Sequence, residues 1–356
     1  MQKFLFFAVA LWFWSAQTAV GQSSKLEIQK IADGVYVAVH TELPGLLPDA
    51  NSVFIINDED VVVVDTNLTL DSARASLGEL RKLTNKPVRF VINTHWHDDH
   101  TTGNQIYREA FPGVEFITHE ETREALSTES VANRQNMMQG APQVVDQIKN
   151  AMAQGKTLFG TALSEHEKES YQGDLARVQQ YLADTPKLSR VLPTVTLNGR
   201  MALHRGSRTI EIRYLGRGHS RGEVVVYLPQ QKVLIAGDLV SPTEPLIGDK
   251  SYVADWIATL EKLREIPADV VVPGHGPVMK DMSKVNVLRD MLVSLKLQTD
   301  AAVAKGETLE QARKEVDLGN FRKAFAGDDP LLNALFSFYV QGPGVAKAYR
   351  EASERK

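Results

Sequence analysis

The six residues His95-Trp96-His97-Asp98-Asp99-His100 contain three of the nine histidines of this chain, and the fold can be inferred outward from them. They directly follow residues 88–93, an apolar run with β-branched side chains that predicts a strand. His95 and His97 are two positions apart at the end of this extended run, so both side chains can point the same way. Asp99 and His100 come where the chain is expected to turn into a helix over residues 101–110. Four residues of ligand type at this spacing predict a metal site.

Three more side chains able to bind a metal follow other predicted strands. His219 lies in the turn Gly216-Arg217-Gly218-His219-Ser220, and His275 lies in Pro273-Gly274-His275-Gly276. Asp238 follows the apolar run at residues 233–237. Glycine lets the backbone bend sharply and approach a ligand closely. Because open α/β sites form at the ends of strands, we expect these side chains to gather with the histidine cluster.

The chain resembles the metallo-β-lactamase superfamily over roughly residues 30–280. It has, in this order, His-x-His-x-Asp-His, an isolated His, Gly-Asp and Pro-Gly-His-Gly. The resemblance implies a dinuclear site with seven ligands: His95, His97 and His219 for a first metal, Asp99, His100 and His275 for a second, and Asp238 bridging both.

Three further positions matter to this resemblance. Asp65, at the end of a valine-rich run, matches a family aspartate that supports the site without binding metal. Thr102 stands where the family usually has glycine, and Glu223 stands where aspartate is common. Neither departure is expected to touch the seven ligands.

The order of predicted elements is β-rich, helical, β-rich and helical, which suits an α/β fold with two sheets, each covered by helices on its outer face. With the resemblance, this predicts an αββα four-layer sandwich, the metallo-β-lactamase fold, over residues 23–285. A helical insertion is expected at about residues 120–190, because residues 120–184 hold few β-branched side chains and predict two or three helices. We interpret the insertion as a lid or a dimer surface. Residues 286–356 predict a helical C-terminal extension.

The first 22 residues predict a signal peptide. Lys3 supplies a positive charge, residues 4–14 form an apolar run, and residues 15–21 include small side chains suited to cleavage. The run is too short for a bilayer crossing, which needs about 20 apolar residues. We therefore expect an exported protein, in a bacterial periplasm, with no stable membrane anchor after cleavage.

Composition restricts the partners and the metal. The formal net charge of −4 leaves no basic excess to hold a phosphate backbone, which argues against a nucleic-acid partner. The absence of cysteine excludes disulfides, thiolate ligands and a cysteine nucleophile. Imidazole and carboxylate ligands without thiolate suit two Zn²⁺ ions per chain, with iron or manganese as alternatives.

This ligand set predicts a metal-dependent hydrolase acting on a small-molecule substrate. Two zinc ions, with Asp99 and Asp238 as their carboxylate ligands, favour a bridging hydroxide at neutral pH that can attack a polarised carbonyl. Asp99 is the expected catalytic residue, because it can also orient the nucleophile or carry a proton. β-Lactamases of the superfamily typically have cysteine or serine where this chain has Asp238. We therefore expect cleavage of an ester, thioester, lactone or related carboxylic derivative.

Three alternatives stay open at this point: β-lactam hydrolysis, an iron-dependent sulfur oxidoreductase, and a binding protein without catalysis. The oligomeric state also stays open. Other residues give weaker indications. Tyr252 and Trp256 either line a substrate pocket or pack in the core, and Arg217 and Arg221 either meet an anionic substrate or are solvated. The apolar loop at residues 43–48 either forms a flap over the metals or is tucked in.

Overall fold

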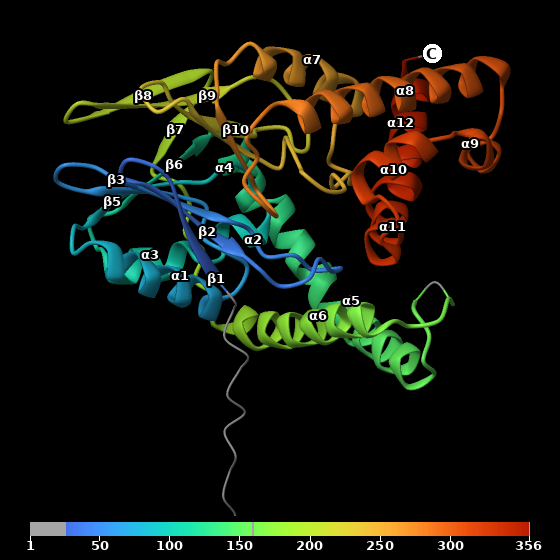
Figure 1. Ribbon diagram of the computed structural model, residues 1–356, viewed down its shortest axis with the longest axis horizontal. Helices are drawn as coiled ribbons and strands as arrows, with labels where there is room; N and C mark the ends of the chain where they lie inside the picture. Colours follow the sequence, from blue (N-terminus) through green and yellow to red (C-terminus); the bar gives the residue numbers. More distant parts are fainter. Residues whose placement is uncertain (1–25, 159, 356) are drawn as a thin grey trace, which may run out of the picture.

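The computed structural model describes residues 26–158 and 160–355, and within them two β-sheets are stacked between two layers of helices (Figure 1). The signal peptide predicted for residues 1–22 lies outside the described residues. Across the described part of the chain, no helix combines the length and the apolar character that a bilayer crossing requires.

The first sheet follows the order of the chain: β1 (Leu26–Ala32), β2 (Val35–His40), β3 (Ser52–Ile56), β4 (Val61–Val64), β5 (Val88–Ile92), β6 (Glu115–His119) and β7 (Val195–Leu197). Pairing is antiparallel from β1 to β4 and parallel from β4 to β7. The second sheet has the order β12 (Val270–Pro273), β11 (Val233–Gly237), β10 (Val224–Leu228), β9 (Arg208–Tyr214) and β8 (Arg200–Arg205). Only the β11–β12 pair of this sheet is parallel, so the described sheets are mixed.

The alternation of side chains along each strand builds the layers. Successive residues of a strand point to opposite faces. On β3, Val53 and Ile55 pack between the sheets, whereas Phe54 belongs to the cluster around the outer helices. β4 and β10 are buried at every position, because both faces of these central strands are covered. The apolar runs that predicted these strands are thus explained by their central place in the sheets.

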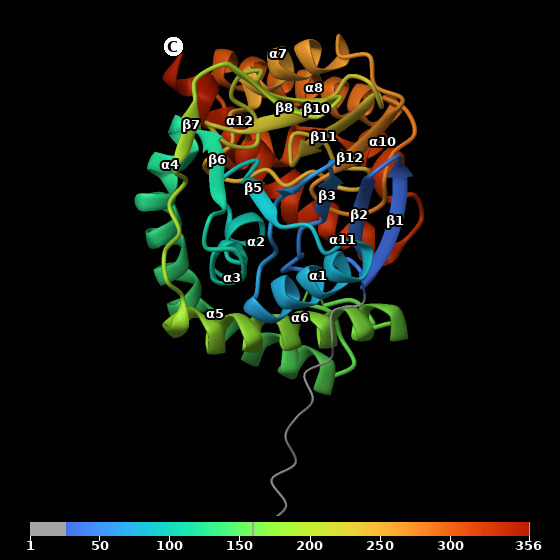
Figure 2. The same cartoon turned by 90° about the vertical axis from the view of Figure 1, so that its left-hand side faces the viewer.

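Helices cover the outer face of each sheet. On the first sheet lie α1 (Leu70–Leu83) and α3 (Asn104–Ala110), and on the second lie α7 (Val253–Arg264), α8 (Ser283–Lys305) and α12 (Gly342–Glu354) (Figure 2). The remaining C-terminal elements are α9 (Leu309–Glu315), α10 (Gly319–Ala326), α11 (Pro330–Phe336) and the π-helix η2 (Ser337–Gln341). The predicted αββα sandwich with a helical C-terminal region is confirmed.

The helical insertion contains α4 (Glu120–Ser127), α5 (Glu129–Ala153), α6 (Glu165–Asp184) and the short 3₁₀ helix η1 (Thr185–Lys187). Helix α6 begins at a capping box, in which the Ser164 and Glu167 side chains each bond the other's backbone N–H. In both ribbon views α5 and α6 lie side by side along the edge of the molecule next to α1 (Figures 1 and 2). The prediction of two or three helices in this segment is confirmed.

One local prediction was wrong, and one strand was missed. The helix expected over residues 101–110 is divided into α2 (Asp98–Thr101) and α3, because the Gly103 N–H donates to the Asn67 carbonyl oxygen at 3.2 Å and not to a helical acceptor. Strand β1 was not predicted. Its residues are only partly buried, as expected for an edge strand, and they lack a clean apolar run.

Candidate metal centre

All seven predicted ligand side chains come together at one end of the two sheets. His95 and His97 follow β5, Asp99 and His100 belong to α2, and His219, Asp238 and His275 follow β9, β11 and β12. Their ligand atoms form two groups, each with all atoms within 4.8 Å of one another. One group contains His95, His97, His219 and Asp238, and the other contains Asp99, His100 and His275.

The first group presents three ring nitrogens and a carboxylate to a common centre. His97 Nδ1 lies 3.0 Å from His95 Nε2 and 3.0 Å from His219 Nε2. Asp238 Oδ2 lies 3.5 Å from His219 Nε2 and 3.9 Å from His95 Nε2. Three imidazoles and one carboxylate are a donor set that zinc accepts in tetrahedral sites.

The second group shares Asp238 with the first. His275 Nε2 lies 3.1 Å from Asp99 Oδ2 and 3.4 Å from Asp238 Oδ2. His100 Nε2 lies 3.3 Å from Asp99 Oδ2 and 3.4 Å from Asp238 Oδ1. His100 Nε2, His275 Nε2 and Asp238 Oδ1 are buried without a hydrogen-bond partner among the described residues. Since buried polar atoms are normally partnered, these facing orphan atoms fit a bound cation.

The other ring nitrogen of three histidines is fixed by a hydrogen bond. His219 Nδ1 donates to the Leu246 carbonyl oxygen at 2.8 Å, and His275 Nδ1 donates to the Asp49 carbonyl oxygen at 3.0 Å. His100 Nδ1 donates to Asp65 Oδ2 at 2.8 Å. Each bond selects the tautomer whose Nε2 lone pair faces the other ligands, which is how outer partners usually orient metal-binding histidines.

Burial and mutual repulsion favour the neutral form of the three histidines in the first group. Burial lowers the pKa of His97 to about 3 and that of His95 well below its usual value, and neighbouring imidazoles lower both further. Burial alone would raise the pKa of Asp238, but His275 and His100 hold it well below its usual value. Against the effect of burial, Asp238 and Asp99 raise the pKa of His275 to about 10. A divalent cation would take the place of the protons held there, so metal binding should release protons.

Asp65 has the supporting position that the resemblance implied. Besides His100, it accepts hydrogen bonds from Thr94 N at 2.8 Å and Thr94 Oγ1 at 2.7 Å, and it is 2% exposed. Its φ of 60° is unusual for a residue other than glycine, and such backbone strain is common at functional sites.

Asp65→Asn is expected to weaken the binding of the second metal by about 10–100-fold, because the amide no longer provides a carboxylate acceptor for His100. Competition between the protein and a coloured zinc chelator measures this affinity. Asp71→Asn, at a side chain that is 61% exposed, is the matched control. Unchanged zinc affinity in Asp65→Asn would show that this contact does not orient His100.

One prediction about the departures from the family pattern was wrong. Glu223 does touch the ligand set, since its Oε1 accepts a hydrogen bond from Asp238 N at 2.8 Å and lies 3.6 Å from His95 Nδ1. Glu223 is fully buried, and burial together with Asp238 raises its pKa well above the usual value. The Glu223 side chain, one methylene longer than the aspartate common in the family, thus reaches Asp238 from the turn before β10.

Comparison with known sequences agrees with this geometry. The sequence profile of the metallo-beta-lactamase superfamily matches residues 47–275, a span that includes all seven side chains. The chain belongs to the metallo-β-lactamase superfamily. Membership in this family accounts for the αββα architecture.

The individual relatives described next share 30% or less of their residues with this chain. The chain is 30% identical over 271 residues to the linear primary-alkylsulfatase of Pseudomonas sp. (strain ATCC 19151), an alignment that covers 73% of this chain and 48% of the relative. The chain thus spans about half the length of that curated relative. Among solved structures, a metallo-beta-lactamase from Pontibacter korlensis aligns with a TM-score of 0.54 at 22% identity, covering 76% of this chain and 99% of that one. DIM-1 metallo-beta-lactamase aligns with a TM-score of 0.51 at 18% identity, covering 76% and 98%. These structural likenesses concern the fold.

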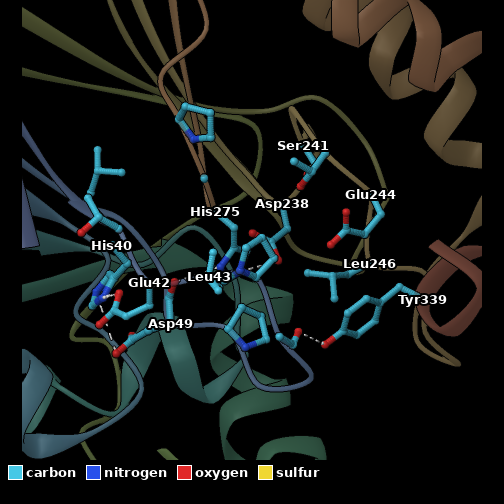
Figure 3. A pocket seen from close by; sticks show the side chains of 18 of the residues that line it. His40, Glu42, Leu43, Asp49, Asp238, Ser241, Glu244, Leu246, His275 and Tyr339 are labelled. Carbon is cyan, nitrogen blue, oxygen red and sulfur yellow. Dashed lines mark hydrogen bonds and ion pairs between the residues drawn. The ribbon is translucent and has the colours of Figure 1, made fainter. Parts of the chain in front are cut away.

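A cavity of about 350 Å³ opens beside Asp238 and His275 (Figure 3). The loop at residues 41–49 forms one wall, and the loop that follows Asp238, together with Tyr339, forms the other. The apolar loop at residues 43–48 therefore lies next to the candidate metal centre. Trp256, by contrast, is fully buried in the core. Arg217 pairs with Asp255, and Arg221 pairs with acidic residues of α4 and α5.

The insertion helix α6 holds this loop in place, a role for which the sequence had no motif. Asp174, fully buried on α6, accepts hydrogen bonds from Leu46 N at 2.9 Å and Leu47 N at 3.2 Å. Tyr339, in η2, donates from its hydroxyl to the Gly45 carbonyl oxygen at 3.0 Å. A Cβ at Gly45 would overlap with the Asp174 carboxylate, so glycine permits this close approach.

Asp174→Ala is expected to speed amide hydrogen exchange at Leu46 and Leu47 by about 10–100-fold, because each amide loses a hydrogen bond to a charged acceptor. Exchange followed by mass spectrometry measures the effect without any substrate. Glu165→Ala, at a side chain on the same helix that is 91% exposed, is the control. Equal exchange at Leu46 and Leu47 in both variants would mean that the loop is held without Asp174, by contacts such as that of the Tyr339 hydroxyl with Gly45.

Proposed function

We propose that this chain is a dinuclear zinc hydrolase that cleaves a small-molecule ester, thioester, lactone or related carboxylic derivative. The position of Asp238 is the observation that carries the proposal, because its carboxylate faces both groups of ligand atoms at 3.4–3.9 Å. A donor set of imidazoles and carboxylates without thiolate supports zinc, with iron and manganese as the alternatives.

When bound, zinc supplies Lewis acidity and lowers the pKa of water toward about 7. His95, His97 and His219 would hold one ion, Asp99, His100 and His275 would hold the other, and Asp238 would contribute to both. Asp99 Oδ2 lies 3.3 Å from His100 Nε2 and 3.1 Å from His275 Nε2, which places the carboxylate beside the ligands where the attacking water would bind. There it orients the water and accepts its proton. The loop at residues 43–48 forms a wall of the cavity next to these ligands, a position in which it would shield them from bulk solvent.

The walls of the cavity favour a carboxylic derivative over a sulfate ester. Leu43, Pro44 and Leu246 offer apolar surface for an acyl group or an alcohol. A sulfate ester is the second candidate, since the 30% identical relative is an alkylsulfatase. Among the described residues that line the cavity, Arg177 is the one arginine or lysine, and it is already paired with Asp174 at 3.1 Å. An anionic sulfate would therefore find no free guanidinium or ammonium group in this wall.

Elemental analysis is expected to find about two zinc ions per chain, and chelation by EDTA is expected to abolish hydrolysis until zinc is returned. The substrates to compare are a 4-nitrophenyl ester, a thioester, a lactone, dodecyl sulfate and a chromogenic β-lactam. Turnover of dodecyl sulfate alone would favour the second candidate. One iron per chain without hydrolysis of any substrate would contradict the proposal and favour an oxidoreductase.

A further inference from the structure

Glu244 is a buried carboxylate that the candidate metal centre does not use. It follows β11 on the loop that forms one wall of the cavity, and it is 8% exposed. Its Oε2 atom is buried without a hydrogen-bond partner among the described residues. Burial raises the pKa of Glu244 to about 7. A carboxylate buried in this way costs free energy unless a partner is provided.

The other buried charged groups of the cavity wall already have partners of opposite charge. His40 lies 3.4 Å from Glu42 and 3.8 Å from Asp49 on the opposite wall. Arg177 pairs with Asp174. Asp238 and His275 belong to the candidate metal centre. Glu244, by contrast, has hydrogen bonds from Thr243 and its own backbone but no ion pair among the described residues, so a bound molecule can supply the complementary charge at its unpartnered Oε2.

The position of Glu244 fits contact with a ligand. In Figure 3 its carboxylate points into the same space as Asp238 and His275, beside Leu246 and across from Leu43. Apolar side chains thus lie in the walls between the carboxylate and the opposite loop. A molecule that fills this space would meet the metal centre, an apolar wall and the Glu244 carboxylate.

We propose that Glu244 forms a subsite for a protonated amine, so that the preferred substrate is a carboxylic derivative whose ammonium group is joined to the reacting carbonyl by an apolar spacer. The identity of the reacting bond rests on the function proposed above, whereas the subsite itself does not. An ammonium group offers three N–H donors and the charge that Glu244 needs, and such charge-assisted hydrogen bonds are among the stronger ones in proteins.

A protonated Glu244 would act differently, because a neutral carboxyl can donate a hydrogen bond to an anion. Glu244→Gln distinguishes the two cases. Glutamine keeps the size and a donor but loses the negative charge, so it preserves anion binding and weakens ammonium binding. Glu244→Asp keeps the charge and serves as the conservative variant.

The first test is calorimetric titration of the zinc-loaded full chain at pH 8 with hexylammonium, 1-hexanol and hexyl sulfate. Glu244→Gln is expected to weaken hexylammonium binding by about ten-fold, to change 1-hexanol binding far less, and to leave hexyl sulfate binding unweakened. Glu244→Asp should retain most of the hexylammonium affinity. Glu315→Gln makes the same charge change at an exposed position on α9 and should behave as the wild type. Unchanged hexylammonium binding in Glu244→Gln would overturn the proposal, as would weakened hexyl sulfate binding.

The second test separates this proposal from the proposed function. The 4-nitrophenyl esters of 6-aminohexanoate and heptanoate have the same length and differ in a terminal ammonium or methyl group. The kcat/KM for the 6-aminohexanoate ester divided by that for the heptanoate ester is expected to fall by about ten-fold in Glu244→Gln. If neither ester is cleaved but the calorimetric preference holds, the proposed function fails and the subsite stands. If both are cleaved with a ratio that Glu244→Gln leaves unchanged, the subsite is wrong and the hydrolase stands.

Discussion

Asp238→Ala is expected to lower kcat/KM for the best ester substrate on the order of 10³-fold and to reduce the zinc content below two per chain. Asp238 contacts both ligand groups, with Oδ1 facing His100 and Oδ2 facing His95, His219 and His275. Among the described residues, no other carboxylate contacts histidines of both groups. Loss of the Asp238 carboxylate should therefore affect both metals. Elemental analysis and steady-state kinetics on the same preparation measure both effects.

Alanine is a suitable substitution here because the surrounding backbone does not depend on the carboxylate. Glu223 holds Asp238 through its backbone N–H, a bond that alanine retains. Asp249→Ala removes a carboxylate that is 79% exposed and lies on the same long loop, and it should keep full zinc content and activity. Two tightly bound zinc ions and undiminished turnover in Asp238→Ala would rule out a bridging role.

The convergence of the seven side chains could be predicted because local features mark each of them. His95 and His97 follow an apolar strand that ends at Ile92, and the bend after it brings His95 Nε2 within 3.0 Å of His97 Nδ1. His219 and His275 lie in glycine-containing turns, and parallel pairing of β11 with β12 brings Asp238, which follows β11, next to His275, which follows β12. The apolar runs of β4 and β10 predicted strands, and in the structure every position of both strands is buried because the stacked sheets and the helices cover both faces.

The contacts that support the site could not be predicted in the same way. Asp174 binds the backbone of residues more than 120 positions away, and nothing in the local sequence of α6 indicates that partner. Asp98 lies inside the ligand motif, yet its partners are on two insertion helices. Such contacts depend on how helices pack on the sheets, which short sequence patterns do not specify. The insertion, for which a lid or a dimer surface was predicted, therefore also has a supporting function.

Asp98 connects the ligand motif to this insertion. It is 6% exposed and accepts hydrogen bonds from Ser130 Oγ at 3.1 Å, from Arg134 Nη2 at 2.7 Å and from Tyr181 Oη at 2.5 Å. Arg134 donates a second bond through Nε at 3.2 Å, which gives a bidentate ion pair. Burial and Asp98 raise the pKa of Tyr181, so its hydroxyl remains a donor. Asp98, which lies between the ligands His97 and Asp99, thus binds side chains of both α5 and α6.

Asp98→Asn is expected to lower the free energy of unfolding by about 3 kcal/mol, because it leaves the largely buried guanidinium of Arg134 without its counter-charge. Urea unfolding of the zinc-loaded protein measures the change. Asp146→Asn, at an exposed position on α5, makes the same chemical change away from the motif and should have little effect. The double variant Asp98→Asn/Arg134→Met should regain part of the loss, since it also removes the unpaired charge. A loss below about 1 kcal/mol in Asp98→Asn, the range of exposed ion pairs, would show that the insertion is held by other contacts.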